Sequence, residues 1–372
     1  MKLHLLRAAL IAAGCIATAH AFADDHDGGR YESESRKPVT IAVFGDWPYN
    51  QNLLDNAALL TGSVNRSKDV SLVLHVGDIH SGSMACTSAG ILPPIPTSNP
   101  GWNQRVYYQL QQFNAPVVYT PGDNEWSDCH KSKEQKSGDP LKELAAVRSL
   151  FFAKAGLTLG RHERKVATQA KHFDPAYPAD AQFVENVMWQ DSDVVFVTVN
   201  MPGSNNDTLP WTNGFGNAAA QANEVTERTA ADIRWLRAAF DRADREDAKA
   251  VVIAQQANMW DPEALTAGGD GLSAYKEYVQ ELADLSTRFG RPVLLLNGDS
   301  HVYDSDRPLA DPTSATGLIH GTQAVPNLVR VTVQGSTTAP GEWLKLTIDP
   351  RTKDVFSWKN VPYCLNPTGS CQ

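Results

Sequence analysis

Short apolar runs alternate with longer amphipathic stretches along most of the chain, which is the pattern of a β-sheet covered by helices. Strands are predicted at 39–46, 71–78, 116–120, 193–200, 250–255 and 292–297. Helices are predicted between them, at 52–66, 103–113, 139–156, 223–243 and 272–289. Because the strands are almost continuously apolar, we expect a sheet that is buried on both faces.

The region after residue 326 has a different pattern. The runs 327–336, 343–350 and 354–358 are rich in β-forming residues and are separated by turns, so they are predicted to be antiparallel strands. Two long segments without a periodic pattern, 81–101 and 201–221, are predicted to be loops. Loops of this length are uncommon unless they are functional, so we expect them to act as lids that select a substrate.

Four of the predicted strands end in the same dipeptide, Gly-Asp. The aspartates are Asp46, Asp78, Asp123 and Asp299. A single such pair is usually a turn or a helix cap, but ligands of such sheets bind at the carboxyl ends of the strands. Four carboxylates in one crevice repel each other unless cations neutralise them. Two divalent cations balance four negative charges, so the pattern indicates a two-metal site.

The order and spacing of these motifs resemble the calcineurin-like metallophosphoesterase family. The family pattern runs D-x-H, G-D, G-N-H-[DE], a lone His after a strand, and G-H-x-H. The matching stretches are "GDWP", "VGDIH", "GDNEW", "IAQQAN" and "GDSHVY", and the resemblance extends from Val39 to Tyr303. It implies an α/β fold in which two packed mixed β-sheets are flanked by helices, with a metal site at the carboxyl ends of the strands. It also implies hydrolysis of a phosphoester.

Carried over position by position, the resemblance implies two sets of metal ligands. The first set is Asp46, Asp78 and His301. The second set is Asp78 as a bridge, Asp123, Asp299 and the amide oxygen of Gln256. Gln255 would take the place of Gln256 if the match is shifted by one residue.

The chain departs from the family pattern at most of these positions. Pro48, which cannot bind a metal, stands where the family has the His of D-x-H. Asp123 replaces an Asn, and Gln256 and Asp299 each replace a His, so the changed positions keep an oxygen donor. Hard oxygen donors favour Mn²⁺ or Mg²⁺, with Ca²⁺ as an alternative, over Zn²⁺ or iron. We therefore expect two divalent cations of this kind as cofactors.

The resemblance implies that a hydroxide bridging the two metals attacks the phosphorus atom in line. Asn124 stands where the family has a His that assists the leaving group. General acid catalysis is worth ~10²–10⁴-fold, so we expect a preference for good leaving groups unless His80 supplies the proton. His80 is otherwise a candidate for the missing metal ligand or an ordinary loop residue. Glu125 is predicted to orient Asn124 or a ligand.

Other residues have both a structural and a functional interpretation. His75 lies inside a strand and is predicted to be a core histidine, and His130 is a weaker candidate for the site. Trp47, Trp126 and Trp211 are interpreted either as walls of the substrate crevice or as packing residues.

A catalytically inactive protein of the same fold is the alternative interpretation. It would hold a structural cation or none, and its loops would bind a ligand. The sequence has no Walker-type phosphate loop and no nucleophile elbow. The choice between a phosphomonoester and a phosphodiester stays open, as does the oligomeric state.

The first 23 residues are predicted to be a secretory signal peptide. Lys2 and Arg7 precede an apolar run from Ala8 to Ala19, and a small-x-small cleavage signal follows at 21–23. The run is well short of the ~20 residues that span a bilayer, so no membrane span is expected; a lipoprotein cysteine at Cys15 is a second interpretation.

Cleavage changes the formal charge from −9 to −11, because it removes two cations and no anion. Such an acidic chain is unsuited to nucleic acid but is compatible with a small substrate or with a site that gathers metal cations; the resemblance implies that the substrate is a small phosphoester.

Four cysteines remain after residue 23, and none has the spacing of a zinc site. In an exported protein an even number indicates disulfides. Among three connectivities we predict the pairs Cys86–Cys129 and Cys364–Cys371. The protein is therefore expected to be exported, either periplasmic or secreted, with a flexible segment at 24–38 and a single domain at 39–372.

Overall fold

The computed structural model describes residues 37–86, 101–134, 138–338 and 341–363 of the 372-residue chain. The predicted signal peptide, nearly all of the predicted flexible segment and the predicted Cys364–Cys371 pair lie outside the described residues. Within the described residues, no helix is long and apolar enough to cross a membrane.

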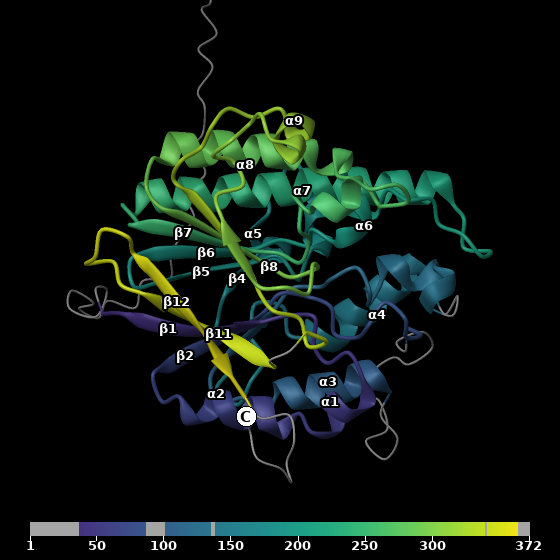
Figure 1. The fold of residues 1–372 in the computed structure, drawn as a ribbon, viewed down its shortest axis with the longest axis horizontal. Coiled ribbons are helices and arrows are strands. Elements are labelled where there is room, and N and C mark those ends of the chain that lie inside the picture. The colour runs from purple at the N-terminus through teal and green to yellow at the C-terminus, as the bar shows by residue number, and fades with distance from the viewer. Residues whose placement is uncertain (1–36, 87–100, 135–137, 339–340, 364–372) are drawn as a thin grey trace, which may run out of the picture. The chain divides into compact units, whose positions relative to one another are not determined.

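Two mixed β-sheets form the middle of the fold (Figure 1). The first has the strand order β12-β11-β1-β2-β3. Its strands are β1 (Val39–Phe44), β2 (Val70–His75), β3 (Val117–Tyr119), β11 (Glu342–Ile348) and β12 (Phe356–Pro362). β1, β2 and β3 are parallel, whereas β11 and β12 continue the sheet in antiparallel pairs.

The second sheet has the order β4-β5-β6-β7-β8-β10-β9. Its strands are β4 (Ala167–Thr168), β5 (Val187–Asp191), β6 (Val194–Thr198), β7 (Ala250–Ala254), β8 (Val293–Asn297), β9 (Asp304–Asp306) and β10 (Leu328–Thr332). β6, β7, β8 and β10 are parallel, and the strands at the two edges pair antiparallel.

Helices cover the outer face of each sheet. Those described are α1 (Gln51–Asp55), α2 (Ala58–Arg66), α3 (Trp102–Leu110), α4 (Pro140–Phe151), α5 (Gln169–His172), α6 (Gly203–Asp207), α7 (Ala218–Arg245), α8 (Lys276–Phe289) and α9 (Ala315–His320). Short 3₁₀ helices lie at Ser127–His130, Ser132–Glu134, Pro178–Gln182, Pro262–Leu265 and Ser273–Tyr275. In Figure 1, α7 and α8 lie above the second sheet, and α1, α2 and α3 lie below the first.

The alternation of side chains along the strands explains this layering. In β1, Ile41 and Val43 join the core between the two sheets, whereas Ala42 and Phe44 join the core under the helices of the first sheet. The strands of the second sheet alternate in the same way between the core shared by the sheets and the core under α7 and α8. The prediction of strands buried on both faces is therefore confirmed.

The predicted α/β class with two packed mixed sheets is confirmed, and so are the strands predicted before residue 300. One expectation was wrong, and another was right only in part. The helix predicted at 52–66 is two helices, because the main chain leaves the helical conformation at Asn56, with φ −105° and ψ 21°. The run at 327–336, predicted to be an antiparallel strand, forms β10, which pairs antiparallel with β9 as predicted but parallel with β8. β4, β5, β9 and the short helices were not predicted.

Candidate metal centre

The residues predicted to bind metal follow strands of both sheets. Asp46, Asp78 and Asp123 follow β1, β2 and β3 of the first sheet, and Gln256, Asp299 and His301 follow β7 and β8 of the second. The two sets meet directly, because the main-chain N–H of Asp299 lies 3.2 Å from each carboxylate oxygen of Asp46. The structure therefore brings the predicted residues together at the carboxyl ends of the strands.

Close contacts explain why glycine precedes these aspartates. A Cβ atom at Gly122 would lie 2.0 Å from Oδ1 of Asp78, and one at Gly298 would lie 2.5 Å from Oδ2 of Asp46. Each glycine thus leaves room for the carboxylate of a neighbouring strand end. The Gly-Asp pairs are therefore a packing requirement of the site as well as a turn signal.

Four of the site residues adopt left-handed backbone conformations. The φ angles are 48° at Asp46, 60° at Asp78, 75° at Asp299 and 62° at His301. Such conformations are uncommon for residues other than glycine and cost about 1–3 kcal/mol each, and they concentrate at functional sites. These conformations occur where the chain turns after β1, β2 and β8.

One half of the site consists of Asp46, Asp78 and His301. One ligand atom from each residue lies within 4.8 Å of the other two. Both aspartates are buried, whereas the side chain of His301 is 39% exposed. This half of the site is therefore a group of three donors, of which His301 is the one exposed to solvent.

The hydroxyl of Tyr49 lies among these three donors. It is 2.7 Å from Oδ2 of Asp78, 3.1 Å from Oδ1 of Asp46 and 3.1 Å from Nε2 of His301. Sequence reasoning missed Tyr49, although the residue directly follows Pro48, the position without a metal-binding side chain. Its position next to Pro48 is the signal from which the sequence could have identified Tyr49 as a site residue.

The other half of the site contains Asp123, Asp299 and Gln256. The amide nitrogen of Gln256 donates to Oδ1 of Asp123 at 3.0 Å and to Oδ1 of Asp299 at 3.3 Å. Its amide oxygen, predicted as a metal donor, instead accepts the N–H of Gly203 at 2.5 Å. Gln255 donates to Ala257 O, so Gln256 and not Gln255 reaches the carboxylates.

The carboxylates resist ionisation in this arrangement. Burial raises the pKa of Asp46 to about 7. Burial and the neighbouring carboxylate of Asp123 raise the pKa values of Asp78 and Asp299 well above the usual range. Burial is also the main cause that raises the pKa of Asp123. Oxygen donors crowded in this way fit hard divalent cations, which favour the ionised carboxylates.

Asn124 and Glu125 support the turn that follows β3. The amide nitrogen of Asn124 donates to Oδ2 of Asp78 at 2.8 Å and to the main-chain oxygen of His80 at 3.1 Å. Oε1 of Glu125 accepts the N–H of Gly122 at 2.7 Å and the hydroxyl of Tyr119. Glu125 was predicted to orient Asn124 or a ligand; its carboxylate holds the main chain at Gly122, directly before Asp123, and among the described residues it forms no hydrogen bond with the Asn124 side chain.

The histidines near the site differ in their surroundings. His75 is a buried core histidine, as predicted, and burial lowers its pKa to about 4. His80 is also buried, its pKa is lowered by burial to about 4, and its Nδ1 lies 3.2 Å from Ser81 O. Its Nε2 has no hydrogen-bond partner among the described residues. Nδ1 of His130 accepts the N–H of Thr212 at 3.0 Å.

The three tryptophans are packing residues. Trp47, Trp126 and Trp211 are all buried, with exposed fractions of 2%, 0% and 6%. The guanidinium carbon of Arg228 lies over Trp126, 5.5 Å from the centroid of the indole ring. Of the two interpretations of these side chains, their burial therefore supports packing.

Two lysines that sequence reasoning missed lie beside the carboxylates. Nζ of Lys131 and Nζ of Lys133 lie 2.7 Å and 3.1 Å from the carboxylate of Asp128. Burial opposes ionisation of Asp128, but the two ammonium groups outweigh it and lower the pKa of the carboxyl. The Ser204 hydroxyl bonds Asp128 and Asp123 at 2.8 Å each, so it links this ion pair to the site.

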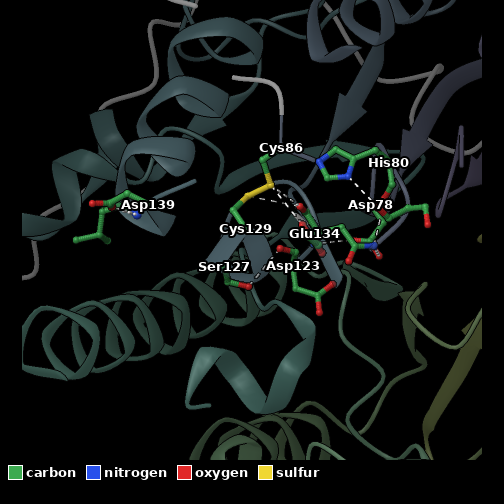
Figure 2. Close-up of a disulfide and its surroundings, with 11 residues drawn as sticks. Asp78, His80, Cys86, Asp123, Ser127, Cys129, Glu134 and Asp139 are labelled. Atoms are coloured by element: carbon green, nitrogen blue, oxygen red, sulfur yellow. Dashed lines mark hydrogen bonds between the residues drawn. A yellow bond between two sulfur atoms is a disulfide. The ribbon is translucent and has the colours of Figure 1, made fainter. Parts of the chain in front are cut away.

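The predicted disulfide between Cys86 and Cys129 is confirmed (Figure 2). It lies beside the turn that follows β3. Sγ of Cys86 lies 3.3 Å from the main-chain oxygen of Asn124 and 3.3 Å from Oε2 of Glu134. Burial, with smaller contributions from Asp128 and Asp123, raises the pKa of Glu134 to about 10. Because the sulfurs are bonded to each other, this group offers no thiolate to a metal.

The chain was compared with known families and structures. A model of the calcineurin-like phosphoesterase family matches residues 39–303. The chain is similar to the solved structure of GAP50, the anchor in the inner membrane complex of Plasmodium, with 9% identity and a TM-score of 0.42 over 88% of this chain and 89% of that chain. It is also similar to a 5′-nucleotidase from Candida albicans, with 11% identity and a TM-score of 0.39 over 87% of this chain and 51% of that chain. No curated protein sequence matches the chain.

Proposed function

The chain belongs to the calcineurin-like phosphoesterase family, and we propose that it hydrolyses a small phosphoester with the help of divalent cations. The observation that carries this proposal is the gathering of Asp46, Asp78 and Asp123 from one sheet with Asp299 from the other. Carboxylates held this close need cations to be ionised near neutral pH.

Two cations would be held by the chain's own oxygen and nitrogen donors. The residues are Asp46, Asp78 and His301 for the first, and Asp78, Asp123 and Asp299, with Gln256 beside them, for the second. Mn²⁺ or Mg²⁺ suits this set best, because most of its donors are carboxylate oxygens. When bound, these ions supply positive charge that polarises the phosphoryl group and stabilises the developing negative charge.

The residues of the chain orient the carboxylates and the substrate. Asn124 holds Asp78 in place through its amide nitrogen, and an amide N–H is far too weak an acid to protonate a leaving group. His80 is neutral near pH 7, because burial lowers its pKa to about 4. We therefore assign no general acid to the site, and substrates with good leaving groups are the expected ones.

A catalytically inactive, ligand-binding protein is the second candidate, and one observation favours it. The carboxylates find hydrogen-bond donors within the chain: Tyr49 and Asn124 for Asp78, and the N–H of Asn258 for Asp299. A site satisfied in this way would persist without cations.

Export and the class of partner also belong to this proposal. The Cys86–Cys129 disulfide supports export, because disulfides persist in oxidising compartments and are rare in the cytosol. The formal charge of −9 disfavours a nucleic-acid partner and leaves a small phosphoester as the proposed substrate.

The test is hydrolysis of p-nitrophenyl phosphate and bis-p-nitrophenyl phosphate by protein stripped with chelator and then supplied separately with Mn²⁺, Mg²⁺, Ca²⁺ or Zn²⁺. Activity should return with Mn²⁺ or Mg²⁺ and should be lost in Asp78→Asn. Asp241→Asn, at an exposed position of α7, is the matched control and should stay active.

The two esters also separate monoesterase from diesterase activity. Folded protein that turns over neither ester with any of the four cations would contradict the proposal and favour the inactive binding protein.

A further inference from the structure

The hydroxyl of Tyr49 has more neighbours than one hydroxyl group can satisfy. Besides Asp46, Asp78 and His301, it lies 3.2 Å from the amide nitrogen of Asn124. A tyrosine hydroxyl carries one proton and donates one hydrogen bond. The shortest contact, 2.7 Å to Oδ2 of Asp78, accounts for that proton. When Asp46 is ionised, its Oδ1, at 3.1 Å, is then a second oxygen that faces the phenol oxygen without a proton between them.

The position of the ring is fixed by its surroundings. Tyr49 is buried, with 6% of its surface exposed. Its ring packs edge-on against the ring of His301, with centroids 5.1 Å apart. The next residue, Asn50, caps α1 by accepting the N–H of Leu53 at 2.9 Å. The phenol oxygen is thus presented by a rigid turn and not by a mobile side chain.

We propose that the Tyr49 phenol oxygen is a fourth donor to the cation held by Asp46, Asp78 and His301, a proposal that rests on the metal site of the proposed function. The oxygen lies within hydrogen-bond distance of all three of those donors. A cation among them replaces the crowding of lone pairs by attraction to each one.

This donor would change the chemistry of that half of the site. Two carboxylates, a phenol oxygen and one imidazole form a set dominated by hard oxygen atoms, which favours hard cations of high charge over Zn²⁺. Tyr49 also directly follows Pro48, so the turn after β1 supplies an oxygen donor although Pro48 offers none.

The test uses Fe³⁺ as an optical probe, because a phenolate bound to ferric iron gives a charge-transfer band in the visible range. Protein stripped with chelator is loaded with Fe³⁺ from a citrate complex, and bound iron is measured separately. The band should appear in the wild type and be absent in Tyr49→Phe, which keeps the ring but lacks the oxygen. Tyr278→Phe, a buried core tyrosine, is the control and should keep the band.

Calorimetric titration with Mn²⁺ gives a second measurement that does not depend on iron. Substitutions that only orient metal ligands lower metal affinity by about 10–100-fold, so Tyr49→Phe should bind Mn²⁺ at least about 10-fold more weakly than Tyr278→Phe. Wild-type protein that binds Fe³⁺ without the visible band would overturn the proposal. If Fe³⁺ is not retained, equal Mn²⁺ affinity in the two variants would overturn it.

Neither measurement uses hydrolysis. A visible band in a protein that cleaves no phosphoester would remove the proposed activity and keep Tyr49 as a metal ligand. Hydrolysis without the visible band, together with equal Mn²⁺ affinities in the two variants, would keep the proposed activity and exclude Tyr49 as a metal ligand.

Discussion

Gly203 lies so close to Asp123 that a Cβ atom added to the glycine would be 2.8 Å from Oδ2 of the carboxylate. The same atom would be 2.9 Å from Oδ1 of Asp299. The loop after β6, predicted to be a lid, therefore packs directly against the second half of the site. The backbone of the loop lies so close to the two carboxylates that a side chain at position 203 would displace them.

Gly203→Ala should weaken cation binding without unfolding the protein, because the atoms in the way are the ends of carboxylate side chains. We expect Mn²⁺ affinity to fall at least about 10-fold, as for other changes that disturb the orientation of metal ligands. Calorimetric titration measures the affinity. Gly62→Ala in α2, where the nearest atom is the flexible end of Arg66 at 3.3 Å, is the control and should bind Mn²⁺ normally. Equal affinities would show that Asp123 and Asp299 do not take part.

Without cations, the stability of the protein should fall as the pH rises. Burial raises the pKa of Asp46 in the folded protein from 3.8 to about 7. The stability that its bound proton contributes is complete below about pH 4 and is lost as the pH rises through 7, at about 1.4 kcal/mol per pH unit. Chemical denaturation in chelator at pH 5, 6, 7 and 8 measures this slope.

Asp46→Asn should be less sensitive to pH than the wild type over this range, and Mn²⁺ should reduce the loss by binding the ionised form. Asp241→Asn should follow the wild type. A wild-type slope in chelator that matches the slope of Asp46→Asn would contradict the raised pKa of Asp46.

Lys133 should assist binding of the phosphate group. A Cβ atom at Gly82 would lie 2.6 Å from Oδ1 of Asn124 and 3.1 Å from Nζ of Lys133, so the ammonium group faces the turn that holds Asp78. Lys133→Gln should raise KM for p-nitrophenyl phosphate about 10-fold, the effect of losing one charge-assisted hydrogen bond of about 1.5 kcal/mol. Lys142→Gln, at an 81% exposed side chain of α4, should leave KM unchanged; a KM equally unchanged in Lys133→Gln would exclude this role.

The Cys86–Cys129 disulfide should stabilise the turn after β3. Replacing both cysteines by Ala should lower the free energy of unfolding by about 2–4 kcal/mol, because the bond closes a loop across a sequence separation of 43. Chemical denaturation with and without reductant measures the effect. Reductant should destabilise the wild type and leave the double variant unchanged; a wild type as unstable as the variant would show that the bond does not contribute.

Part of the site was predictable because its signals are local. Asp46, Asp78, Asp123 and Asp299 each follow an apolar strand and a glycine, and parallel strands place such residues at one edge. The motif order also predicted the family and its limits at residues 39 and 303, which the family match confirms.

The rest depends on contacts between distant parts of the chain. Tyr49 meets His301 across 252 positions, and Ser204 meets Asp123 across 81, distances at which no local pattern carries information. The parallel pairing of β10 with β8 was missed for a similar reason, because a strand's own residues do not show whether its partner runs parallel. The side chain of Gln256 faces the carboxylates with its nitrogen because Gly203 takes its oxygen.

The division of the proposed ligands between the two sheets has a consequence for assembly. A chain in which one sheet has formed and the other has not would hold only part of the set. Divalent ions would then bind firmly only to the docked form, and by mass action they would stabilise that form over all others. Bound ions would therefore stabilise the docked sheets only after both have formed, and a chain that matures without them would dock with these carboxylates protonated.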